Sequence, residues 1–141
     1  MANTVMTSFK SELLQGIHDF ESGGDAFKLA LYTSSYTGNV AGTTIYTTGN
    51  EVPDSGSYSA GGGTLSNQAV SVDGTTAIVD FDDLSFTSAT ITARYGLIYN
   101  DTESDKAVCV LDFGTDQTST SGTFTIQFPS AGASTAIIRV A

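Results

Sequence analysis

The stretch "ITARYGLIYNDTESDKAVCVLDF", residues 91–113, decides the fold of this 141-residue chain. Its first part, residues 91–100, alternates like a strand with two different faces, one of which carries Ile91, Ala93, Tyr95, Leu97 and Tyr99. The last part, residues 106–113, is nearly apolar on both faces, which is typical of a strand covered on both sides. The polar residues 101–105 have the composition of a hairpin loop. The stretch therefore predicts two strong strands joined by a polar loop.

The same two-residue period recurs through most of the chain after residue 27. Clear runs cover 27–33, 77–81, 123–128 and 136–141, and weaker runs cover Thr43–Thr47 and Leu65–Val72. No helical pattern separates the later runs, so parallel strands linked by helices are excluded. The length suits one domain, residues 1–141. We therefore predict a mainly β protein: one antiparallel β-sandwich of the jelly-roll type, with about eight strands and one N-terminal α-helix.

Residues 1–22 have a helical period instead. Apolar residues recur three or four positions apart, as one stripe of Val5, Phe9, Leu13, Ile17 and Phe20. Thr7 or Ser8 is placed to cap the start of this helix, and "SGG" at 22–24 is placed to end it. We expect the stripe to lie on the chain's own sheet, with a partner chain as the alternative cover. His18 is then expected on the helix surface.

The region 34–66 is rich in Gly, Thr and Ser, and it is long for a loop inside a compact domain. Aromatic and apolar residues are spaced along it, and such side chains are typical of contact surfaces. We predict an extended loop with a short strand, which covers a sandwich edge or reaches a neighbouring chain. The candidate contact residues in this loop are Tyr36, Ile45, Tyr46 and Tyr58.

Arg94 is a further candidate contact, because it stands in the middle of the strongest predicted strand. An arginine at such a position usually lies across a solvated sheet face or pairs with an acidic side chain. In an assembly, its guanidinium is also suited to a bidentate contact with a carboxylate of another subunit. Both interpretations are compatible with the sequence.

The charge balance excludes two classes of partner. The chain has 15 acidic and 5 basic residues, for a net charge of −10. The five scattered cations form no stripe that follows a phosphate backbone, so we predict no nucleic-acid partner. The acidity repels anionic membranes, and no apolar run approaches the roughly 20 residues that span a bilayer. We also see no basic start followed by an apolar stretch, so we expect that the chain has no secretory signal. We therefore expect it to be synthesised in a reducing cytosol.

Two further features have structural interpretations. The single cysteine, Cys109, excludes an internal disulfide, and its apolar surroundings in sequence predict a buried, unreactive thiol. The three glycines 61–63 are followed by no lysine and by a strand pattern, unlike a phosphate-binding loop. We therefore predict a turn at these glycines.

The acidic side chains are weak candidates for a calcium site or a catalytic site. Asp101, Glu103 and Asp105 have the spacing of a calcium loop with Asp112 at its twelfth position, but Lys106 replaces the glycine expected at position six. A plain hairpin loop is the favoured interpretation of these residues, and calcium is the alternative. Asp80 and Asp82 fall on the predicted solvent side of a strand, and the one histidine has no serine to form a triad with. We predict no enzyme activity, no cofactor and no metal.

Several segments together resemble small virion proteins of tailed bacteriophages, including those of cyanophage type. The likeness runs through "MTSFKSELLQGIHDF", "FKLALYTSS", "YSAGGGTL", "TSATITARYGLIYN", "KAVCVLDFG" and "FTIQFP". β-Sandwich proteins of this size in that group are similar to capsid cement or decoration proteins. The resemblance implies a homotrimer on the outside of the virion head, bound to the major capsid protein at local threefold positions. It offers no functional motif that transfers residue by residue.

Two other functions fit the same fold class. One is a tail or fibre-associated phage protein that contacts a host receptor. The other is a carbohydrate-binding β-sandwich, against which the absence of tryptophan argues, since sugar platforms commonly use it.

Overall fold

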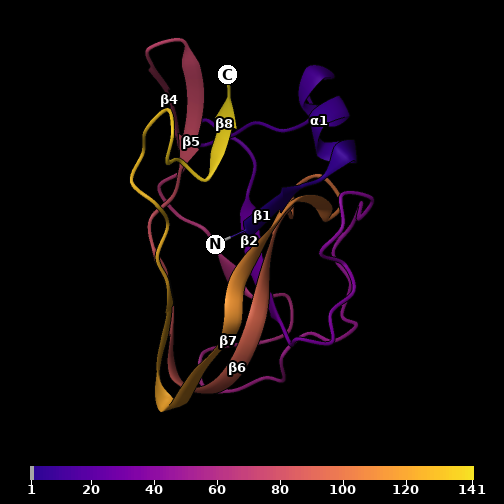
Figure 1. Ribbon diagram of the computed structural model, residues 1–141, viewed down its shortest axis with the longest axis vertical. Coiled ribbons are helices and arrows are strands. Elements are labelled where there is room, and N and C mark those ends of the chain that lie inside the picture. The colour runs from indigo at the N-terminus through magenta and orange to yellow at the C-terminus, as the bar shows by residue number, and fades with distance from the viewer. Residues whose placement is uncertain (1) are drawn as a thin grey trace.

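Two antiparallel sheets and one short helix form the regular structure of residues 2–141 (Figure 1). The computed structural model describes residues 2–141. Its elements are β1 (Ala2–Val5), α1 (Thr7–Leu14), β2 (Phe27–Tyr32), β3 (Gly63–Thr64), β4 (Ala69–Asp73), β5 (Thr76–Asp80), β6 (Leu84–Asn100), β7 (Lys106–Ile126) and β8 (Ile138–Val140). The larger sheet has the order β1-β7-β6-β2-β3, and the smaller has the order β4-β5-β8. The prediction of a mainly β protein with one N-terminal helix is confirmed.

The predicted hairpin is the centre of the larger sheet. β6 and β7 pair from Asn100 and Lys106 beside the turn to Leu84 and Ile126 at the far end. Figure 1 shows this long hairpin bending at the end of the molecule opposite α1. Register shifts interrupt the pairing, and Gly114, with a φ of +84°, lies within one of them. Such bulges bend a strand pair, so one hairpin contributes to more than one side of the core.

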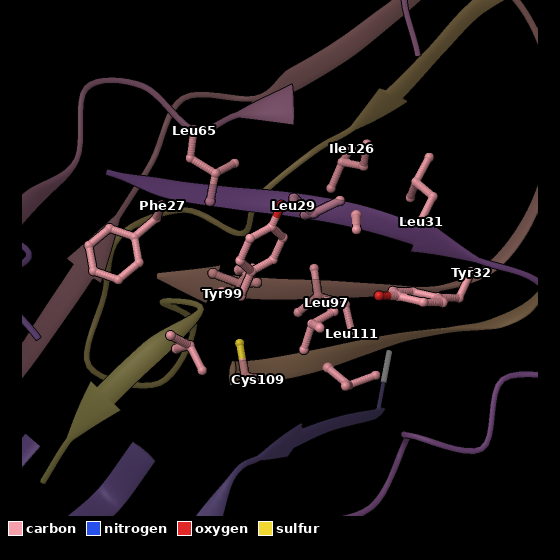
Figure 2. Packing of buried hydrophobic residues seen from close by; sticks show 14 of the residues in the cluster. Phe27, Leu29, Leu31, Tyr32, Leu65, Leu97, Tyr99, Cys109, Leu111 and Ile126 are labelled. Atoms are coloured by element: carbon pink, nitrogen blue, oxygen red, sulfur yellow. The ribbon is translucent and has the colours of Figure 1, made fainter. Parts of the chain in front are cut away.

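The core lies where β2 and the turn-side half of this hairpin meet (Figure 2). Side chains from the three strands point together there, and all of the following are at most 2% exposed: Phe27, Leu29, Leu31, Leu97, Tyr99, Cys109 and Leu111. β1 pairs with the outer edge of β7, and α1 also packs on β7. Cys109 is 1% exposed, so the prediction of a buried thiol is confirmed, and this burial raises the pKa of the thiol to about 12.

The predicted helix 1–22 is too long at both ends. The chain starts as β1, paired with β7, and α1 covers only Thr7–Leu14. The N-cap is Met6, without a side-chain cap, so neither Thr7 nor Ser8 has the predicted role. At the other end Gly16 has a φ of +72°, and the N–H groups of Gly16 and Ile17 donate to the carbonyls of Leu13 and Glu12. This is a Schellman C-cap, which needs a left-handed residue and ends the helix there.

His18 is buried, so the prediction of a helix-surface histidine is wrong. Because the helix ends at Gly16, the chain turns back and the ring of His18 enters a cluster of Phe rings, 4.9 Å from that of Phe9 between centroids. Its side chain is 0% exposed. Its Nε2 lies 2.7 Å from Oε2 of Glu12, and its Nδ1 lies 3.0 Å from the side-chain nitrogen of Asn100.

Asn100 fixes the orientation of that imidazole. Its Oδ1 accepts hydrogen bonds of 3.1 Å from the backbone N–H groups of Thr102 and Glu103, so its amide nitrogen is the group that faces His18. The same nitrogen donates to Oδ2 of Asp25 at 2.8 Å. Nδ1 of His18 therefore accepts, and its Nε2–H donates to Glu12. This chain of bonds joins the end of β6 to the segment that follows α1.

We expect Asn100→Asp to lower the free energy of unfolding by about 3 kcal/mol, because it places a buried carboxylate beside Asp25 and removes the donor to His18. Urea unfolding followed by circular dichroism measures the change. Asn50→Asp is the matched control, since Asn50 is exposed. Equal stability of the two variants would contradict the role of the Asn100 amide.

Candidate functional site

The long loop 34–66 packs on the core, and one carboxylate, that of Glu51, binds several of its groups. Its Oε1 accepts hydrogen bonds of 2.7 Å from the Tyr58 hydroxyl and from the backbone N–H of Gly61. Its Oε2 accepts a bond of 2.6 Å from the Tyr46 hydroxyl. The Tyr58 hydroxyl also accepts from the backbone N–H of Leu31 on β2. Glu51 therefore ties two distant parts of the loop to the sheet.

The structure places the predicted contact tyrosines mainly inside the chain. Tyr58 is fully buried with its ring 4.8 Å from that of Phe86, and Tyr36 is 8% exposed. Tyr46 is half-buried and stacks on Tyr99 at 4.7 Å between centroids. Their aromatic faces thus pack within the chain.

Ile45 and Arg94 lie apart from the Glu51 cluster. Ile45 is 47% exposed and forms an isolated β-bridge with Lys106, where the sequence predicts a short strand at Thr43–Thr47. Nε of Arg94 donates to Oδ1 of Asp112 at 2.8 Å, so this arginine pairs with an acid of its own chain. This contact lowers the pKa of Asp112 and raises that of Arg94. The structure therefore does not gather the five predicted contact residues into one surface.

The structure also places two loops that the sequence analysis considered, the acidic loop 101–105 and the triple glycine 61–63. Residues 101–105 form the turn between β6 and β7, in which Ser104 and Asp105 have positive φ. Asp112 is engaged with Arg94 rather than with this turn. Within residues 2–141 no group of three or more His, Cys, Asp and Glu side chains is arranged to hold a metal ion. Gly62, with a φ of +79°, lies against the backbone of Leu29 and leads into β3, so the predicted turn at the triple glycine is confirmed.

The strongest candidate site is a groove that sequence reasoning missed, here called the apolar groove. It has a volume of about 450 Å³ and lies between the end of α1 and the smaller sheet. One wall contains Leu13, Leu14 and Phe20, and the other contains Val70, Val79, Ile138 and Val140.

Strand register makes the sheet wall apolar. Val70 pairs with Val79 and Val79 pairs with Ile138, which forms one row across the three strands. Val72, Ala77 and Val140 form the next row in the same way. Directly paired residues of antiparallel strands point to the same face, so all six side chains share one face of the smaller sheet.

Only part of this face is covered by the chain itself. Val79 and Ile138 are 7% and 5% exposed, whereas Val72 and Val140 are 70% and 51% exposed. Across the groove Leu14 is 91% exposed, because the helix ends just beyond it. Scattered apolar side chains on a surface are ordinary, but a contiguous group of them is typical of an interaction site.

A signal for this face was present in the sequence. "AVSVDGTTAIV", residues 69–79, has two alternating runs around a two-residue turn at Gly74 and Thr75. Such a hairpin fixes its own register, which places Val70 and Val72 beside Val79 and Ala77. What the sequence could not show is that α1 stops short of covering them.

Comparisons with known proteins give no match to a family, to a curated protein or to a solved structure. No helix within residues 2–141 has the length and apolar character needed to cross a lipid bilayer. The arrangement of the site is therefore the main guide to its function.

We expect Glu51→Ala to lower the free energy of unfolding by about 3 kcal/mol, since it leaves the buried Tyr58 hydroxyl without its carboxylate partner. Chemical denaturation measures this change. Glu21→Ala, at an exposed glutamate, is the control and is expected to stay close to wild type. A loss no larger than that of the control would show that the loop is held by other contacts.

Alkaline pH is expected to unfold the protein cooperatively. Burial is the largest cause that raises the pKa of five tyrosines: Tyr32, Tyr36, Tyr46, Tyr58 and Tyr99. The folded state therefore keeps protons that the unfolded state releases near pH 10, so stability falls as pH rises above about 10. Near-ultraviolet absorbance of tyrosinate should rise together with the loss of circular dichroism. Ionisation of these five side chains well before unfolding would contradict their burial.

Proposed function

We propose that this protein is a structural virion protein of a tailed bacteriophage, which binds the outside of an assembled capsid and stabilises it. The observation that carries the proposal is the apolar groove between α1 and the smaller sheet. A cement or decoration protein acts by binding alone, and binding to the assembled shell favours that shell over its open form by mass action. The resemblance of the sequence to small phage virion proteins supports a location on the outside of the virion head.

The groove has the composition of a protein–protein interface. Such interfaces have an apolar centre and a polar rim. Leu14, Val70 and Val140 supply exposed apolar side chains, while Asp19 and Glu21 supply exposed carboxylates beside them. The net charge of −10 keeps a chain with such a patch in solution until it meets its partner.

The proposal includes the partner and the assembly that the resemblance implies. The major capsid protein is the partner, the protein acts as a homotrimer of jelly-roll sandwiches on the capsid surface, and it is made in the cytoplasm of the bacterial host. Quantifying the protein in purified particles, with antibody labelling to locate it, tests this role. Hundreds of copies on the head support it, whereas a few copies at the tail would favour the tail or fibre protein instead.

We expect Leu14→Ser to weaken binding to particles stripped of the protein by about tenfold, because it removes an apolar side chain from the groove. Co-sedimentation of the protein with the particles measures the affinity. Val40→Ser is the matched control, since Val40 is 54% exposed and is not a lining residue of the groove. Leu14 is 91% exposed, so both variants should fold normally. Equal affinities of the two variants would remove the groove from the shell contact.

A further inference from the structure

β4 is an open edge of the smaller sheet. It pairs with β5 on one side and is the terminal strand of the order β4-β5-β8. All five of its residues are exposed. Alternate residues of an edge strand direct their N–H and C=O groups away from the sheet, where another strand can bind them. The sequence of β4, AVSVD, has no lysine and no proline, the residues that commonly protect such edges.

This edge borders the apolar face that lines the groove. Val70 and Val72 of β4 belong to that face, and they are 40% and 70% exposed. A strand added beside β4 would place every second side chain on the same face, next to these valines. Backbone hydrogen bonds and apolar contacts would then form together, which is the usual basis of peptide recognition by strand addition.

Carboxylates stand near both ends of β4. Gln68, just before the strand, donates from Nε2 to the backbone carbonyls of Glu21 and Asp25, at 2.9 and 2.8 Å. These bonds hold the acidic segment 19–25 beside the start of β4. Asp73 is the last residue of the strand, and its Oδ2 accepts a hydrogen bond of 2.7 Å from the backbone N–H of Ala133, which leaves Oδ1 for a partner. The lining of the groove includes Asp19 and Glu21 and contains no lysine or arginine.

This charge distribution favours one kind of segment as a partner for the open edge of β4. A segment with Lys or Arg at its ends would meet carboxylates at both ends of β4. A second copy of this chain would instead bring another acidic segment and a net charge of −10 to the same edge. The charges therefore favour a cationic partner over self-association at this surface.

We propose that β4 accepts an extended segment of a partner protein as an added strand, with apolar side chains at alternate positions and Lys or Arg at its ends. This inference rests on the proposed function, because it states the chemistry of the segment that a shell protein would offer. The Leu14→Ser variant tests whether the protein binds particles through the groove. The peptide experiment below tests strand addition without particles, so the failure of one proposal can be told from the failure of the other.

The test uses the full chain, labelled with ¹⁵N, and two blocked peptides. Both have a centre of alternating valine and threonine, and one is flanked by lysines and the other by glutamates. We expect the lysine-flanked peptide to bind at least tenfold more tightly. It should shift the amide signals of residues 69–73 and slow their hydrogen exchange. Val72→Lys should abolish this binding, because it places a like charge at the edge. Val40→Lys, with the same change of charge at another exposed valine, should retain it.

Four outcomes of the peptide experiment would overturn the proposal. These are no binding of the lysine-flanked peptide at millimolar concentration, equal binding of both peptides, signal changes that lie outside β4 and the groove, and unchanged binding by Val72→Lys. Sedimentation of the chain alone tests the other candidate for the β4 edge, a second copy of the chain. Self-association that Val72→Lys abolishes would assign the edge to a second copy instead of a partner.

Discussion

The pairing of β6 with β7 is the constraint on which the rest of the larger sheet depends. β2 adds to the free edge of β6 and β1 adds to the free edge of β7, so the order of that sheet follows from one hairpin. The bulged positions in the hairpin bend it, and its far half then reaches the loop, where Phe86 contacts Tyr58. The loop 34–66 therefore contacts the far half of the hairpin as well as β2, to which the backbone N–H of Val52 donates.

The smaller sheet is formed under a weaker constraint, and this explains its exposed face. Its three short strands build one apolar face by register, but of that face Val79 and Ile138 are buried, whereas Val70, Val72 and Val140 are exposed. α1 could have covered more if it had continued along the apolar stripe. Gly16 ends it, and the following residues turn inward so that His18 packs among the Phe rings instead. The open groove is therefore a consequence of where the helix stops.

The sequence was sufficient where one local pattern determined the outcome. The hairpin 91–113 and the class of the fold follow from alternation, and the turn at the triple glycine follows from backbone freedom. The predicted helix is too long because Phe20 is buried and Ile17 half-buried by the turn that follows α1, and apolar spacing does not distinguish such a turn from a helix. The placement of Tyr58 depended on Glu51, and no local pattern marks a single carboxylate as the partner of two distant hydroxyls. The apolar groove needed the relative position of α1 and the smaller sheet, which only tertiary structure provides.

Charge and apolar surface have separate roles in this molecule. Apolar contacts at Leu14, Val72 and Val140 can supply affinity, but they discriminate poorly among partners. The carboxylates of Asp19, Glu21 and Asp73 act within a Debye length of about 8 Å at physiological salt, so they influence only a partner that is already close to the groove. At that distance they favour a cationic segment and disfavour another acidic chain. A net charge of −10 therefore disfavours a second copy of the chain at the exposed apolar groove and the open sheet edge.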